Sequence, residues 1–268
     1  MPLTVDQARA ALQVAAWRDT IGEMPSEVLV GLALDAVVAG MDGPRLIELA
    51  GADSSDPRDL RDLWQAVVVE QGIERADEQN ALWQLVRHTA NGVVDGTVAP
   101  IVAANWLWRS ASHRMEPEGD LRIFIGLASE AEDHPEQLQD IADAVVTECR
   151  RLLTRQRPRR WLRLQAGHDG ALSFATTSGQ SHRGPDQLPV PASLATRLLD
   201  WQREWTESVG KGGFVAIPAA EEFVTAGEAL ADELQGVLGA DWHVEYYPEP
   251  VRTPGVRLRS RWKARSRT

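Results

Sequence analysis

The chain has a single cysteine among its 268 residues, Cys149. One thiol excludes an intramolecular disulfide framework and a zinc site built from several thiolates. The chain also lacks a run of about 18 apolar residues, the length that a membrane-spanning helix needs. Its first residues do not combine a basic start with an apolar run, as a signal peptide would. We therefore expect a cytoplasmic protein that does not insert into a membrane.

Motifs that mark well-known catalytic sites are also missing. The sequence contains no HExxH zinc box, no GxSxG nucleophile elbow and no GxxxxGK[ST] phosphate loop. Residues 209–214, VGKGGF, have the glycines of a phosphate loop but follow a predicted helix, so we interpret them as a helix stop and a turn. No motif fixes a reaction, and we expect neither a catalytic residue nor a cofactor.

The charge of the chain is distributed unevenly. The net charge is −11, but residues 1–150 carry 26 acidic and 11 basic side chains, whereas residues 151–268 carry 13 acidic and 17 basic ones. A strongly acidic half repels nucleic acid and attracts basic partners, with association rates that fall as salt rises. The shift in charge near residue 155 also predicts a domain boundary.

The sequence pattern of residues 1–150 predicts consecutive helices. Thr4 and Gln7 have the spacing of a capping box, and Leu60, Trp64 and Val67 belong to an apolar stripe of helical period. Helices are predicted within residues 4–17, 25–40, 43–51, 54–72, 78–96, 98–112 and 135–153. Short connections between such helices favour antiparallel packing, so residues 1–155 are predicted to form an acidic, all-α helical bundle.

The pattern changes after the basic, proline-containing joint at residues 154–160. Two segments of period two flank Asp169-Gly170, a pair typical of a hairpin turn. Two amphipathic helices follow at 192–209 and 220–239, then strands at 241–247 and 255–262, with Trp201 and Trp205 expected in the core. The chain is thus predicted to be α+β overall, with residues 159–268 forming a small domain of two helices and a short antiparallel sheet, followed by a basic tail.

Three carboxylates and one histidine cluster at Glu130, Glu132, Asp133 and His134. Carboxylate and imidazole groups suit zinc or manganese, and with His113 added, a metal-assisted hydrolase using His113, Glu130, Asp133 and His134 is an alternative hypothesis. Neighbouring residues on a helix diverge by about 100°, however, so the side chains of the four clustered residues at 130–134 cannot all point at one ion. The simpler interpretation is the solvated start of the next helix, capped by Asp133 or His134.

The same residues are candidates for binding a partner. The carboxylates would meet Arg or Lys on a basic protein, where charge complementarity speeds association. Trp106 and Trp108 lie two positions apart and face different ways on a helix, and large aromatic side chains anchor protein interfaces. We therefore predict a partner-binding set of Glu130, Glu132, Asp133, His134, Trp106 and Trp108.

The basic tail offers another alternative. Residues 252–268 contain seven basic side chains and no acidic one, and Arg257, Arg259 and Arg261 would share one face of a strand. Such a row can bind phosphates, and Trp262 can stack on a base. The tail can equally pair with the acidic N-terminal half of the same or a second chain. Apart from this tail, we expect no nucleic-acid partner.

Residues 25–153 also resemble a group of uncharacterised bacterial helical proteins, some of them thought to be immunity-like partners of toxins. The resemblance rests on GLALDAVVAGMDGPRLIELAG, on the Gly96 turn before the Pro100 helix, and on the acidic segment before the last helix, with Ala128, Ser129, Glu130, Glu132 and Asp133. It implies a binding role and no catalytic residue.

These observations favour a non-enzymatic, cytoplasmic protein-interaction module. An immunity-like protein that neutralises a basic toxin or nuclease is the specific form of this hypothesis. The metal-assisted hydrolase and the nucleic-acid-associated protein are kept as alternatives.

Overall fold

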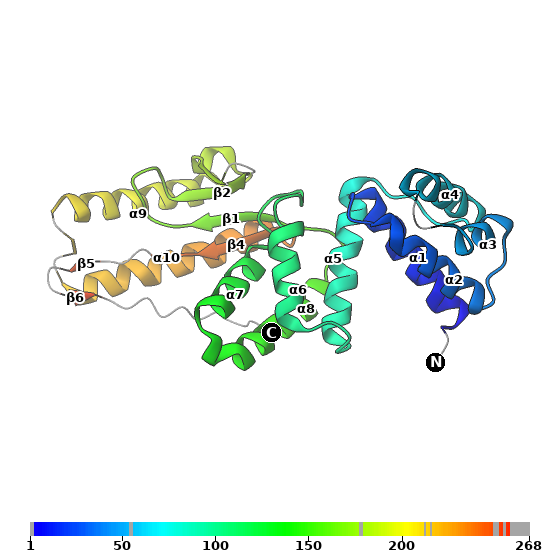
Figure 1. Cartoon of the computed structure of the whole chain (residues 1–268). Coiled ribbons are helices and arrows are strands. Elements are labelled where there is room, and N and C mark those ends of the chain that lie inside the picture. Colours follow the sequence, from blue (N-terminus) through cyan, green and yellow to red (C-terminus); the bar gives the residue numbers. More distant parts are fainter. Residues whose placement is uncertain are drawn as a thin grey trace. The chain divides into compact units, whose positions relative to one another are not determined.

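The computed structural model describes residues 3–53, 56–176, 179–211, 213–214, 216–248, 252–253 and 256–257 (Figure 1). It divides the chain into two compact units, residues 1–116 with 123–157, and residues 117–122 with 158–268. The predicted α+β class with an N-terminal helical bundle is confirmed. In the part of the chain that is described, no helix is both long and apolar enough to cross a membrane.

The first unit is helical. Its elements are α1 (Val5–Thr20), α2 (Ser26–Val38), α3 (Pro44–Ala50), α4 (Pro57–Glu70), α5 (Glu78–Val94), α6 (Pro100–Trp106), the π-helical turn η1 (Leu107–Ala111), α7 (Arg122–Asp133), the 3₁₀ turn η2 (Pro135–Gln137) and α8 (Leu138–Leu153). The first four helices share a core that includes Leu12, Leu46 and Trp64. Apolar side chains at helical spacing are therefore buried as predicted.

Local polar contacts fix the ends of these helices. The predicted capping box is present, because the Thr4 hydroxyl accepts from the Gln7 backbone N–H and the Gln7 side chain accepts from the Thr4 N–H. Helix α3 has no cap of its own. Instead, the Glu70 carboxylate at the end of α4 accepts from the backbone N–H groups of Arg45 and Leu46, each at 3.0 Å. A side chain distant in sequence thus satisfies donors that a helix start leaves open.

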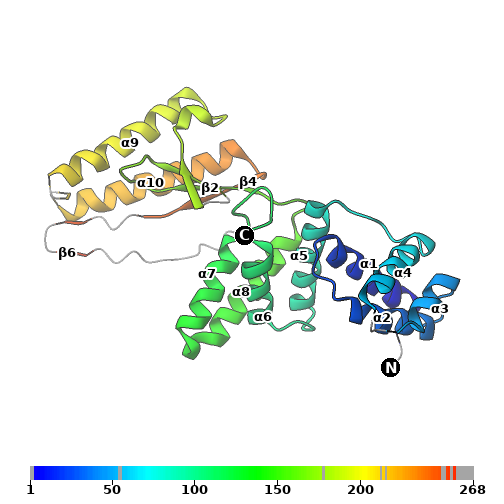
Figure 2. The ribbon, with the colours of Figure 1, turned by 45° about the horizontal axis from the view of Figure 1, so that its top comes forward.

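The second unit contains a four-stranded sheet in the order β3-β2-β1-β4. Its elements are β1 (Arg160–Leu164), β2 (Leu172–Thr176), β3 (Gly179–His182), the 3₁₀ turn η3 (Pro185–Gln187), α9 (Ala192–Gly210), α10 (Ile217–Leu238), β4 (Trp242–Tyr246), β5 (Arg252–Thr253) and β6 (Val256–Arg257). Figure 1 labels β2, β1 and β4 of this sheet, and Figure 2 shows β2 and β4 near α9 and α10. The predicted hairpin joins β1 and β2, with Leu164 opposite Leu172 and Gly170 at φ +119° in the turn.

The prediction of an antiparallel sheet is wrong in one respect. Strand β4 pairs parallel with β1, from Arg160 opposite Trp242 to Leu164 opposite Tyr246, so the sheet is mixed. The physical reason lies in the connection between β3 and β4, which runs through α9 and α10. A connection through helices lets the next strand enter the sheet parallel to its neighbour. Strands β5 and β6 form a separate antiparallel pair. The rest of the strand predicted at 255–262 lies outside the described residues.

Helices α9 and α10 cover one face of the sheet. Leu162 and Leu164 from β1 and Leu172 and Phe174 from β2 project into a core that both helices complete. Trp201 stacks on Phe223 with ring centroids 4.7 Å apart and donates its indole N–H to the Phe223 carbonyl oxygen at 3.1 Å. Trp201 and Trp205 are both buried, which confirms the prediction that they pack in the C-terminal core.

Candidate functional site

The predicted partner-binding residues Trp108 and Glu132 are connected through a third side chain. The Arg109 guanidinium lies 4.7 Å from the centre of the Trp108 ring and pairs with the Glu132 carboxylate at 2.5 Å. Trp106 is half-buried and donates its indole N–H to Glu23 at 3.2 Å. The charge of Glu132 is therefore already matched by a cation of the same chain, and Arg109 shares the surface that carries Trp108.

The remaining members of the predicted cluster are exposed. Glu130 lies on α7, Asp133 ends it, and neither forms an ion pair with any described residue. His134 precedes the 3₁₀ turn but makes no side-chain capping bond, and its Nδ1 lies 3.2 Å from Glu136. These side chains are open to a partner, as the interaction hypothesis requires.

The structure does not gather the alternative metal ligands. His113 is exposed in the turn after η1, away in sequence from the cluster at the end of α7. Among the residues described, no group of three or more His, Cys, Asp or Glu side chains is placed to hold a metal ion. Cys149 is fully buried, and burial together with the neighbouring Glu148 charge raises the pKa of its thiol to about 12. A thiol with so high a pKa is a poor nucleophile near neutral pH.

The alternative nucleic-acid residues lie at the edge of the described chain. Arg257 belongs to β6 by its backbone. Arg259, Arg261 and Trp262 lie outside the described residues.

The helical layer of the second unit is acidic, which the count over residues 151–268 conceals. Helix α10 carries five carboxylates and no Lys or Arg over 22 residues, and α9 carries three carboxylates and two arginines. The excess of basic residues in this half comes from the joint before β1 and from the tail. Counting charge for each predicted helix, rather than for the whole half, would have located this acidic layer.

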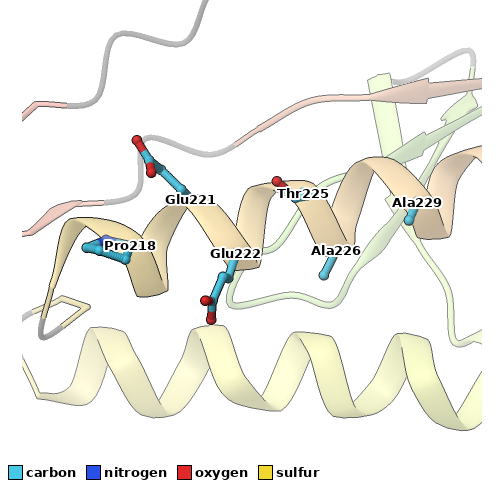
Figure 3. Close-up of a pocket in the computed structure, with 6 residues that line it drawn as sticks. All are labelled: Pro218, Glu221, Glu222, Thr225, Ala226 and Ala229. Carbon is cyan, nitrogen blue, oxygen red and sulfur yellow. The ribbon is translucent and has the colours of Figure 1, made fainter.

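The carboxylates of α10 form two rows on its outer surface. With about 100° between consecutive residues, Glu221, Glu228 and Asp232 line one side, while Glu222 and Glu233 line the other. A shallow groove of about 490 Å³ runs along these rows and is lined by Pro218, Glu221, Glu222, Thr225, Ala226 and Ala229. Of its small residues, Pro218, Thr225 and Ala229 fall between the rows. In Figure 3, Glu221 and Glu222 project to opposite sides of α10, with Glu222 toward α9. We call this surface the α10 groove.

Part of the acidic charge near the groove is paired. Glu233 forms an ion pair with Arg197 of α9 at 2.7 Å, and Asp200 pairs with Arg203 along α9 at 2.9 Å. Glu221 and Glu222 are exposed and form no ion pair with any residue that the structure describes. The first turns of α10 therefore present negative charge that an external cation can reach.

The opposite face of the sheet is occupied by contacts within the unit. Arg163 lies between the rings of Trp161 and Tyr247, at 5.1 and 4.8 Å from their centres, and donates to Glu245 at 3.0 Å. Arg122 covers the Trp161 ring at 4.4 Å. Burial, and then repulsion from Arg163, lower the pKa of Arg122, although a guanidinium remains charged at any physiological pH. This face is a stacked polar cluster, whereas the α10 groove is open.

Comparison with known proteins adds one similarity. Residues 161–249 match the model of a family described as Serratia CdiI immunity protein-like. The matched segment begins at the second residue of β1 and includes β2, β3, α9, α10 and β4. A comparison with curated proteins found no match. The match agrees with the resemblance to immunity-like proteins expected from the sequence, but the matched residues lie in the second unit rather than in residues 25–153.

Proposed function

We propose that the protein is an immunity-like protein that binds and neutralises a protein toxin with a basic surface, without catalysing a reaction. The observation that carries this proposal is the match of residues 161–249 to an immunity protein-like family. Immunity by binding requires a surface complementary to the toxin rather than an organised set of catalytic groups. An acidic surface suits a basic partner, because complementary charges steer the encounter and raise its rate.

Two acidic surfaces are candidates for this contact. One is the α10 groove, where Glu221 and Glu222 are exposed and form no ion pair with described residues. The other is the exposed end of α7, with Glu130, Asp133 and the Trp108–Arg109–Glu132 contact beside it. We place the toxin contact on the α10 groove, because it lies within the matched segment and its Glu221 and Glu222 carboxylates form no ion pair with any described residue.

The proposal is tested with the partner that the protein captures. The full chain is purified from its own cells at low salt, and the intact complex is weighed to identify the bound protein. That protein is then expressed with and without the chain in a bacterial host. We expect it to stop growth when it is expressed alone and to be harmless when the chain is present.

Variants separate the two candidate surfaces. Glu221→Lys with Glu222→Lys should abolish the protection of growth, while Glu130→Gln with Asp133→Asn should preserve it. Protection that survives the α10 variant and is lost in the α7 variant would move the contact to α7. If the captured protein is harmless when it is expressed alone, the immunity proposal is wrong.

A further inference from the structure

The α10 groove has a complementary segment within the same chain. Residues 252–268 carry seven basic side chains and no acidic one, while α10 carries five carboxylates and no basic residue. From 257 to 267 every second residue is Arg or Lys. In an extended chain, successive side chains point to opposite sides and residues two apart are about 6.5 Å from each other. Six cations would then form a single row.

The two rows of carboxylates on α10 suit such a row of cations. Glu221 and Glu228 lie seven residues apart, about 10 Å along the helix, and Asp232 follows about 6 Å further on. The floor between the rows is made of the small side chains of Thr225 and Ala229, while Ala226 lies on the side of Glu222 (Figure 3). Arginine side chains can lay their apolar stems over such a floor while their guanidinium groups reach the carboxylates on either side.

The start of the basic segment is already held at this helix. Strand β5, Arg252–Thr253, contacts α10, and β5 pairs with β6 (Figure 1). A helix of 22 residues is about 33 Å long, and the residues that follow β5 exceed this length when extended. Tethering gives the segment an effective concentration on the order of millimolar, so weak individual ion pairs are sufficient for docking.

We propose that residues 252–268 dock along the α10 groove of their own chain, with their basic side chains facing the two rows of carboxylates. The segment then occupies the surface that the proposed function assigns to the toxin, and a basic partner has to displace it. Only this competition rests on the proposed function. The docking itself is independent of it and is measured without any partner.

The test is a distance measurement in the full chain. Two cysteines are introduced, Ala229→Cys on the floor of the groove and Ser260→Cys in the basic segment, in a Cys149→Ala background, and both are spin-labelled. At about 0.01 M salt we expect a short, narrow distance distribution. At about 1 M salt, where the screening length falls to about 3 Å, the short distances should be lost. Glu221→Lys with Glu222→Lys should abolish them at low salt.

A matched variant controls for net charge. Glu204→Lys with Glu207→Lys makes the same charge change on the exposed surface of α9 and should leave the short distances in place. A broad distribution of distances between the two spin labels at low salt, in the protein whose α10 carboxylates are unaltered, would overturn the proposal. So would short distances that appear only between singly labelled copies after mixing, because the segment would then dock on a second chain. Loss of the short distances in the α9 variant to the same extent would also contradict docking in the α10 groove.

Discussion

The ring of Tyr246 on β4 packs against the bare α-carbon of Gly227 on α10. A Cβ atom at position 227 would lie 2.5 Å from the Tyr246 hydroxyl oxygen and 2.7 Å from two of its ring carbons. Gly227 is buried in the helix that carries the groove. Its missing side chain is therefore what allows α10 to approach the parallel strand pair so closely.

Gly227→Ala should destabilise the second unit. Alanine favours a helix over glycine by about 1 kcal/mol, but overpacking a well-packed site costs about 1–3 kcal/mol, so we expect a net loss of about 1 kcal/mol. Gly236→Ala on the same helix is the control, because its Cβ would meet nothing within 4 Å. It should stabilise the protein in the same urea titration. Equal stabilisation by both changes would contradict the close approach of Tyr246.

The same tyrosine predicts a loss of stability in alkali. Burial, with a contribution from the nearby Glu228 charge, raises the pKa of the Tyr246 hydroxyl well above its usual value near 10. The folded state therefore holds this proton more tightly than the unfolded state. Ionisation of this hydroxyl leaves the free energy of unfolding unchanged below about pH 10. Above that pH it lowers the free energy of unfolding by up to about 1.4 kcal/mol per pH unit. Urea unfolding of Tyr246→Phe between pH 8 and pH 11 should show a shallower decline than the unaltered protein, and an identical decline would exclude this role.

Glu70 is expected to stabilise α3 from a distance. Desolvation alone would raise the pKa of its carboxyl group, but the backbone N–H groups of Arg45 and Leu46 hold the pKa below its usual value. Stability from this contact is present above about pH 4.5 and is lost as the pH falls through the lowered pKa. Glu70→Gln should cost about 1 kcal/mol at pH 7, as other losses of a helix cap do.

A second substitution checks that the Glu70 effect comes from capping. Glu74→Gln removes the same charge from an exposed side chain a few residues further on and should cost nothing measurable. The difference between the Glu70 and Glu74 variants should narrow in acid. A constant difference from pH 7 down to pH 2 would contradict the carboxylate cap.

Cys149 should be inert in the folded protein. Because it is fully buried and the pKa of its thiol is raised to about 12, we expect a thiol reagent to modify it only at the rate at which its surroundings open. In urea, one equivalent of thiol should react at once. Rapid stoichiometric reaction in native buffer would mean that the helix α8 does not bury this side chain.

Local patterns predicted much of this fold. The helical spacing of Leu60, Trp64 and Val67 and the Asp169-Gly170 turn are signals within a few residues, and the structure has a helix and a hairpin there. The parallel pairing of β4 with β1 joins residues about 80 positions apart, and no local pattern specifies such a partner. The pairing of β4 with β1 could therefore be established only from the three-dimensional structure.

The candidate surfaces were predicted less completely. The exposed carboxylates Glu130 and Asp133 were identified from the sequence, but the bridging position of Arg109 between Trp108 and Glu132 depends on how α6, η1 and α7 pack. The α10 groove was missed because the charge was counted over residues 151–268 as a whole. In that sum the negative charge of α10 is cancelled by the positive charge of the tail. Helical geometry then resolves five carboxylates into two rows that composition alone does not reveal.

The most direct test of the account is the association rate of the chain with the partner that the proposed function assigns to it, measured against salt. We predict a rate that falls at least about tenfold between low and physiological salt, and a similar fall at low salt for Glu221→Lys with Glu222→Lys. The α9 variant Glu204→Lys with Glu207→Lys should keep most of the rate. A rate that does not depend on salt and is equal in the unmodified protein and both variants would contradict recognition of a basic toxin by the acidic α10 groove.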